Sequence, residues 1–182
     1  LDTRLICDRE GNEPETILDF GSGIGASTPF FAELFPSSRK LSADVSEKSL
    51  EFLQSRYPNF SEPVHISHDR IPLTDSSVDL VFTACVFHHI PANEHIHWLK
   101  EIRRVLKPNG MFVLFEHNPL NPLTVRAVNT CPFDENAVLI PAKTMMQRLM
   151  NAGFSASEKR YRIFFPSVLS ALRPIEKALT WL

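Results

Sequence analysis

The sequence predicts an α/β protein with a doubly wound, mostly parallel sheet. Three observations support this prediction: short apolar runs alternate with segments of helical periodicity, glycines cluster directly after the first apolar run, and residues 111–117 are almost wholly apolar. Strands that alternate with helices are typical of parallel sheets covered on both faces. With 182 residues, 43% of them hydrophobic, the chain has the size of one globular domain.

The first half of the chain is predicted to contain four strands and two helices. Ser27 or Thr28 can cap the first helix, and Pro29 fits its first turn. Ser46 can cap the second helix. No helix is expected between the third and fourth strands. The strands are expected over residues 16–20, 40–45, 63–67 and 78–84.

The second half begins regularly and then becomes irregular. Residues 93–106 have the apolar periodicity of a helix, for which Asn93 is a suitable cap. Asn109, in the turn that follows, tolerates the left-handed conformation that such a turn requires. The apolar strand over residues 111–117 is expected to be central in the sheet. Beyond it we expect an irregular, proline-punctuated insertion over 118–141, a helix over 142–153, a strand over 155–165 and an apolar helical tail.

Composition and charge exclude several classes of partner. The net charge is -2 and the pI is about 6.4, so no broad basic surface for nucleic acid is expected. No apolar run approaches the roughly 18 residues that span a bilayer. Cys7, Cys85 and Cys131 are widely separated, which indicates reduced thiols and favours a cytoplasmic location.

A glycine-rich turn follows the first predicted strand. The segment ILDFGSGIGAST places Gly21, Gly23 and Gly25 between that strand and the next helix. Such a turn lets a ligand approach the backbone at the positive end of a helix dipole. Asp19 lies two residues before the first glycine, and Asp44 lies nineteen residues after the last. An acid at about that distance is where the ribose hydroxyls of a nucleotide are bound.

The spacing of these glycines favours one nucleotide over another. Dinucleotide-binding folds prefer G-x-G-x-x-G, whereas this chain has G-x-G-x-G with an acid upstream. The Asp19 carboxylate would repel a pyrophosphate but suits a ligand that carries an ammonium group. An NAD-dependent oxidoreductase is therefore disfavoured, and a P-loop is excluded because no Gly-Lys-Ser/Thr follows.

Four segments together resemble the class I S-adenosylmethionine-dependent methyltransferases, of the small-molecule type similar to the ubiquinone and menaquinone biosynthesis methyltransferases. The resemblance implies a Rossmann-like sheet, the methyl donor S-adenosyl-L-methionine, and residues 1–182 as a single methyltransferase domain. That family also has a seventh, antiparallel strand and an amino-terminal roof helix, neither of which is recognisable here, so we expect a chain that is incomplete at both ends. The segments are ILDFGSGIG, LSADVS, IPLTDSSVDLVFTACVFHHI and EIRRVLKPNGMFVLFEH.

The resemblance also implies roles for individual residues. The carboxylate of Asp19 and the backbone of the turn would hold the methionine moiety, and Asp44 would bind the ribose hydroxyls. One departure affects the adenine side, because the segment DRIP leaves a single residue between Asp69 and the Ile-Pro pair. The implied cofactor-binding residues are Asp19, Gly21, Ser22, Gly23, Gly25, Asp44, Val45, Asp69, Arg70 and Cys85, with Val45, Asp69 and Arg70 near the adenine and Cys85 under the sulfonium.

Histidines follow two of the predicted strands. Because His88 and His89 are neighbours, we expect their side chains to point to different sides, and we expect no metal site. A general base is a better use, since histidine accepts protons near neutral pH. His88, His89 and His117 are the candidate catalytic residues, needed only for a hydroxyl or acidic-carbon acceptor.

The predicted function is methyl transfer to a small-molecule acceptor through an O, N or C nucleophile. Residues 118–141 are expected to contribute to the acceptor pocket, with Arg126, Asn129 and Asp134 as candidate polar contacts. An alternative is a non-catalytic cofactor-binding protein with a regulatory or assembly role. The tail, from Phe164 onward, is amphipathic and is a candidate for contact with a membrane or a lipid-like substrate. The pattern names neither the acceptor nor the oligomeric state.

Overall fold

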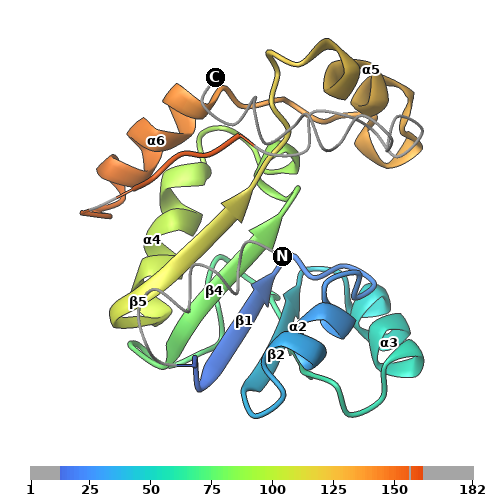
Figure 1. The fold of residues 1–182 in the computed structure, drawn as a ribbon, viewed down its shortest axis with the longest axis vertical. Helices are drawn as coiled ribbons and strands as arrows, with labels where there is room; N and C mark the ends of the chain where they lie inside the picture. Colours follow the sequence, from blue (N-terminus) through green and yellow to red (C-terminus); the bar gives the residue numbers. More distant parts are fainter. Residues whose placement is uncertain (1–12, 156, 162–182) are drawn as a thin grey trace. The chain divides into compact units, whose positions relative to one another are not determined.

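The computed structural model describes residues 13–155 and 157–161 of the chain (Figure 1). These residues form two compact units. Unit 1 contains the described residues up to Val86 together with His97–Phe115, and unit 2 contains Phe87–Ile96 and the described residues from Glu116 onward. The chain passes from unit 1 to unit 2 between residues 86 and 87, and again between residues 115 and 116.

Unit 1 is built on a parallel sheet whose order in the described chain is β3-β2-β1-β4-β5. Figure 1 labels β2, β1, β4 and β5 of this sheet. This arrangement confirms the predicted doubly wound α/β fold. The order reverses between β1 and β4, and such a switch point is where open α/β sheets bind ligands. The strands are β1 (Thr16–Phe20), β2 (Arg39–Asp44), β3 (Glu62–His65), β4 (Val78–Ala84) and β5 (Leu106–Phe115).

Helices cover both faces of this sheet, because side chains alternate between the faces along each strand. Helix α2 (Thr28–Leu34) packs on the face of Ile17, where the rings of Phe31 and Phe82 meet at 5.1 Å. Helix α4 (His95–Val105) packs on the opposite face, where Trp98 lies 5.7 Å from Phe20. The alternation of side-chain directions along β1 thus places Asp19, two residues after Ile17, on the same face as α2.

The three predicted helix caps agree with the structure to different degrees. Helix α3 (Glu47–Arg56) begins after Ser46, whose side chain accepts a hydrogen bond from the Ser49 amide as expected. Ser27 is the N-cap residue of α2 but makes no capping side-chain hydrogen bond. Helix α4 begins at His95, two residues after the predicted cap.

Strand β5 differs from the prediction in its position. It pairs only with β4 among the described strands, and it is therefore an edge strand of this sheet rather than a central one. Its register jumps from Leu106 opposite Val78 to Met111 opposite Leu80, so the intervening turn bulges out of the ladder. Asn109 adopts the predicted left-handed conformation in that turn, with φ of 68°.

Unit 2 contains more regular structure than predicted. Residues 122–130, expected to be irregular, form helix α5 (Pro122–Thr130). The side chain of Asn121 accepts hydrogen bonds from the Leu123 and Thr124 amides, and Pro122 occupies the first turn. Pro122, one of the prolines on which the irregular insertion was predicted, thus begins a helix together with Asn121, since both residues suit that position. The described part of unit 2 also contains two short 3₁₀ helices, η1 (Phe87–His89) and η2 (Pro132–Asp134), and helix α6 (Ala142–Asn151).

The end of the chain is described only in part. Helix α6 is confirmed, and Gly153 follows it with φ of 94°. Residues 157–161 of the predicted last strand have no regular secondary structure. The remainder of that strand and the amphipathic tail lie outside the described residues. Within the described residues, no helix is long and apolar enough to cross a bilayer.

Candidate functional site

The glycine-rich turn lies at the carboxyl end of β1 and is left-handed at all three glycines, with φ of 76°, 52° and 83°. A Cβ atom on Gly21 would clash with the Val86 side chain, and one on Gly25 would lie 2.8 Å from Leu53 Cγ. A Cβ atom on Gly23 would meet nothing within 4 Å. The two outer glycines are therefore required by packing, whereas the backbone at Gly23 borders open space that a ligand can enter.

Asp44 ties this turn to the end of β2. Its Oδ2 atom accepts a hydrogen bond from the Gly23 amide at 2.8 Å, and its Oδ1 atom accepts one from the Ser46 amide at 2.8 Å. The Gly21 and Ser22 amides both donate to the Ala43 carbonyl, at 2.8 and 3.0 Å. The predicted second acid is thus brought against the glycine turn, and each carboxylate oxygen keeps a further lone pair for a ligand.

Asp19 is a buried carboxyl group with an unsatisfied oxygen. Its side chain is 4% exposed, and its Oδ2 atom has no hydrogen-bond partner among the described residues. Burial, followed by the charge of Asp44, raises its pKa from 3.8 to about 7, and a hydrogen bond from Ser27 opposes this increase. The hydroxyls of Ser22 and Thr28 are also buried without a partner among the described residues.

These features fit S-adenosylmethionine, whose methionine moiety carries an ammonium group. A cation beside Asp19 would offset the burial of its negative charge and satisfy Oδ2. The open backbone at Gly23 admits such a ligand without a steric clash. The residues predicted to hold the methionine moiety are therefore compatible with it in geometry and in charge.

The predicted adenine-side residues occupy more exposed positions. Val45 is 69% exposed directly after Asp44, and Ile24 is 48% exposed in the glycine turn. The backbone carbonyl of Asp69 accepts a hydrogen bond from His97 Nε2 at 2.5 Å. The carboxylate of Asp69 takes no part in that hydrogen bond. Arg70 pairs with Asp75 at 3.7 Å on the surface. The adenine role of Asp69 and Arg70 stays a prediction.

Cys85 follows β4 and has a strained backbone. Its φ is 59°, a left-handed value that a non-glycine residue rarely adopts, and its amide donates to the Phe115 carbonyl at 2.9 Å. Strain of this kind often occurs at ligand sites. The hydrogen bond joins the ends of β4 and β5, so it holds the exposed Cys85 side chain at the carboxyl edge of the sheet.

A histidine cluster forms in unit 2 around Glu116. One oxygen of Glu116 accepts from the Phe87 amide at 2.7 Å, and the other lies 2.7 Å from His88 Nδ1. Because an ionised carboxylate only accepts, His88 Nδ1 is the donor in this pair. His88 is 1% exposed, so this contact holds its imidazole in a single orientation.

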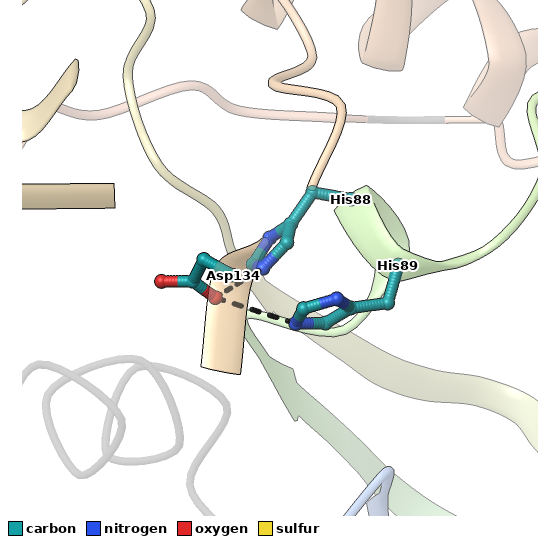
Figure 2. Close-up of side chains that lie close together, drawn as sticks. All are labelled: His88, His89 and Asp134. Carbon is teal, nitrogen blue, oxygen red and sulfur yellow. Dashed lines mark ion pairs between the residues drawn. The ribbon is translucent and has the colours of Figure 1, made fainter. Parts of the chain in front are cut away.

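Figure 2 shows that Asp134 lies against both neighbouring histidines. Its Oδ1 atom is 3.5 Å from His88 Nε2 and 3.4 Å from His89 Nε2. The prediction that His88 and His89 point to different sides was wrong, since their ring centroids are 4.2 Å apart. The two residues lie in the 3₁₀ helix η1, where successive side chains differ by about 120° rather than by the 180° of a strand. His117 also joins the cluster, with its ring 5.2 Å from that of His88.

The charges of the cluster affect its histidines in opposite directions. Burial lowers the pKa of His88, but the hydrogen bond and charge of Glu116 and the charge of Asp134 outweigh it, and the net pKa is raised. Burial and the charge of His88 lower the pKa of His89. The sequence predicted Asp134 only as a polar contact of the acceptor pocket, because nothing in the spacing of residues 88, 116 and 134 predicts that they meet.

His95 has a structural role. His95 is buried, its Nε2 donates to the Ile90 carbonyl at 2.8 Å, and its Nδ1 lies 2.6 Å from Arg148 Nη1. Since the guanidinium can only donate, His95 Nδ1 accepts and the imidazole is neutral. Burial, opposed by the hydrogen bond to Ile90, lowers its pKa, which agrees with this neutral form.

Unit 2 also contains a surface hollow beside α5. Its volume is about 460 Å³, and its lining is mostly apolar. Arg126 and Asn129, two of the predicted substrate contacts, line this hollow, whereas Asp134 belongs to the histidine cluster. The three polar residues therefore divide between two places.

A parallel sheet with a glycine turn at its switch point, and two acids beside that turn, defines the class of Rossmann-like nucleotide-binding proteins. The family model described as a methyltransferase domain matches residues 18–114, which is more than half of the chain. The chain thus belongs to the class I S-adenosylmethionine-dependent methyltransferase family, and S-adenosylmethionine is the cofactor of that family.

Curated relatives agree with this assignment. An uncharacterized methyltransferase of Schizosaccharomyces pombe is 43% identical over 103 residues, which are 57% of this chain and 39% of the relative. A malonyl-[acyl-carrier protein] O-methyltransferase of Methylococcus capsulatus is 28% identical over 91% of this chain and 62% of its own length. A demethylmenaquinone methyltransferase of Thermotoga maritima is 29% identical over 88% of this chain and 65% of its own length. The chain thus spans less than two thirds of each of these relatives.

Solved structures support the fold. A SAM-dependent methyltransferase from Aquifex aeolicus superposes with a TM-score of 0.68 at 20% sequence identity. The match covers 87% of this chain and 82% of that one. At this identity the similarity supports the architecture alone.

Proposed function

We propose that the protein transfers a methyl group from S-adenosylmethionine to a small-molecule acceptor with an O, N or C nucleophile. The observation that carries the proposal is the buried Asp19 carboxyl group, whose unsatisfied oxygen lies beside a glycine turn that is open at Gly23. When bound, S-adenosylmethionine supplies a methyl group made electrophilic by its sulfonium. The chain contributes binding and alignment, which supply most of the acceleration of an in-line displacement.

Each residue of the cofactor site has a proposed role. Asp19 binds the ammonium group, and the backbone of Gly21, Ser22, Gly23 and Gly25 surrounds the methionine moiety. Asp44 accepts hydrogen bonds from the ribose hydroxyls through the lone pairs that the Gly23 and Ser46 amides leave unused. Val45 contacts the adenine face, Asp69 and Arg70 lie at its edge, and Cys85 passes under the sulfonium.

We also propose that the histidine cluster activates acceptors that must lose a proton. His88 is enclosed, and its Nδ1 is occupied by Glu116. The side chain of His89 is 42% exposed, and His117 is partly exposed, so these two can reach an acceptor directly. An amine that attacks in its neutral form would need no such group.

Two observations support a small-molecule acceptor. The names of the relatives include a quinone precursor and a carrier-bound malonyl group as substrates. The hollow beside α5 combines apolar walls with Arg126 and Asn129, which suits an apolar acceptor with a polar or anionic end. Residues 118–141 are therefore proposed to contribute to the acceptor pocket.

Calorimetry of the full-length protein with S-adenosylhomocysteine tests the proposal. We expect one site per chain, and the matched variant Asp44→Asn should bind more weakly because it loses a charged acceptor. An absence of binding by the folded parent protein would contradict the assignment. Cofactor binding with no methyl turnover against any fraction of a cell extract would instead support the non-catalytic alternative.

A further inference from the structure

The donor atoms of three side chains converge in unit 2 in the manner of a metal site (Figure 2). His88 Nε2, His89 Nε2 and a carboxylate oxygen of Asp134 all lie within 4.8 Å of one another. Imidazole nitrogen and carboxylate oxygen are common ligands of divalent transition metals. We propose that His88, His89 and Asp134 bind a divalent cation, with zinc as the best fit.

The buried end of His88 supports this proposal independently. Its Nε2 atom is fully buried and has no hydrogen-bond partner among the described residues. Because Glu116 takes the proton on Nδ1, the neutral imidazole directs the lone pair of Nε2 toward Asp134 Oδ1, 3.5 Å away. A lone pair that faces a carboxylate oxygen in a buried place is repulsive unless a proton or a metal cation lies between them, so Nε2 is a position that a metal can take in place of a proton.

The distances favour tetrahedral coordination. Zinc–nitrogen bonds of about 2.05 Å and zinc–oxygen bonds of about 2.1 Å place tetrahedral ligand atoms about 3.4 Å apart. The same bonds at the right angles of an octahedron would place them about 2.9 Å apart. The observed separations from Asp134 Oδ1 are 3.5 Å to His88 Nε2 and 3.4 Å to His89 Nε2. These two separations match the tetrahedron and exceed the octahedron by about half an ångström, and the two histidine nitrogens lie within 4.8 Å of each other.

The surroundings of the three ligands are organised before a metal binds. Glu116 holds His88 Nδ1 at 2.7 Å, and a carboxylate in this position sets the tautomer of a ligating histidine. The Val138 amide donates to the His88 carbonyl at 2.9 Å, which anchors the segment after η2 against η1. The exposed side chain of His89 leaves a route by which a cation can enter.

Three protein ligands leave the fourth tetrahedral position open, which is typical of catalytic rather than structural zinc. That position would take an anionic oxygen or sulfur donor, since zinc lowers the pKa of a bound hydroxyl, thiol or water. Metal binding itself does not depend on the proposed methyl transfer, whereas acceptor activation by the metal does. With the metal bound, His88 and His89 are ligands, and the cluster would act on the acceptor through the cation rather than as a base.

Metal analysis of the full-length protein tests the site. Protein stripped with a chelator is dialysed against zinc, and bound metal is measured by elemental analysis. We expect one zinc per chain at micromolar free zinc, and we expect cobalt(II) to give the intense visible bands of a tetrahedral site. Substoichiometric binding, or a weak octahedral cobalt spectrum, would overturn the proposal.

Matched variants locate the metal. Asp134→Asn keeps the side-chain shape, and His89→Gln replaces the imidazole by a neutral polar side chain. Both should weaken zinc binding more than Glu116→Gln, for which a loss of about 10- to 100-fold is expected. His68→Gln, an exposed histidine of unit 1, should leave zinc binding unchanged. Equal zinc affinity in all four variants overturns the site. Circular dichroism identifies any variant that fails to fold. If a variant does not fold, the zinc stoichiometry of the parent protein still tests whether the metal site exists. Binding of S-adenosylhomocysteine is measured separately, so either proposal can fail alone.

Discussion

The cofactor site of unit 1 and the histidine cluster of unit 2 each contain a buried ionisable side chain with an unsatisfied polar atom. They differ in what surrounds that side chain. Asp19 has a second carboxylate nearby, and its burial raises its pKa to about 7. His88 lies beside the carboxylates of Glu116 and Asp134. Their negative charges stabilise the protonated imidazole and raise the pKa of His88 despite its burial. The protein itself thus compensates the charge of His88, whereas the charge of Asp19 requires a ligand.

The largest expected effect is on cofactor binding by Asp19→Asn. Removing one member of a buried, hydrogen-bonded charge pair costs about 2–5 kcal/mol, so affinity for S-adenosylhomocysteine should fall about 30-fold or more. Calorimetry at pH 8 measures this loss. An affinity within about threefold of the parent would contradict the ammonium role and remove the contrast between the two sites.

The same substitution should stabilise the ligand-free protein. The folded state holds the Asp19 proton up to about pH 7, whereas the reference pKa is 3.8, so parent stability falls as pH rises between these values. The asparagine side chain has no proton to lose, and the variant should gain up to about 4 kcal/mol relative to the parent above pH 7. Chemical denaturation at pH 5 and pH 8 tests this. If the stability of the variant relative to the parent decreased as the pH rises, the prediction would be refuted.

Glu116→Gln should have the opposite effect on stability and destabilise the protein. Glutamine offers one acceptor and one donor group where Glu116 accepts from both the Phe87 amide and His88 Nδ1, so one buried donor loses its partner. An unsatisfied buried donor costs about 1–3 kcal/mol. Denaturation in the presence of a chelator measures this cost without any metal contribution. Glu135→Gln is the matched exposed control and should change stability by less than about 0.5 kcal/mol. Equal effects of the two variants would show that Glu116 does not organise the cluster.

The smallest expected difference is between the stability effects of alanine substitutions at Gly23 and Gly25. Gly25→Ala combines a left-handed backbone with a contact of 2.8 Å to Leu53, so it should lose about 2–4 kcal/mol of stability. Gly23→Ala has the backbone cost alone, about 1–2 kcal/mol, and should instead weaken cofactor binding. Thermal denaturation and calorimetry on both variants separate packing from ligand approach. If Gly23→Ala binds S-adenosylhomocysteine normally, the open space at Gly23 is not where the ligand lies.

The sequence predicted most of unit 1 correctly. The bounds of β1 and β4 agree residue for residue, and Ser46 caps α3 as expected. These features depend on local periodicity and on side chains that contact their own neighbourhood. The predicted central position of β5 was wrong for the described sheet, because an apolar composition favours a strand but does not determine how many strands pair with it. Of its apolar residues only Leu106 and Val113 are buried. The prediction of an irregular segment over 118–141 was also wrong for residues 122–130, which form α5. Proline occurs both in irregular chain and in the first turn of helices, so Pro122 did not distinguish the two.

The candidate sites divide in the same way. Asp19 and the three glycines lie within seven consecutive residues, so their spacing alone identified a nucleotide site with a place for a cation. The sequence by itself also determined the order of strands and helices and the family to which they belong. Only the tertiary structure decided that Asp44 holds the amide of Gly23 and that His88, His89, Glu116 and Asp134 meet. Contacts between residues far apart in the chain depend on the path of the whole backbone, and no local pattern encodes that path.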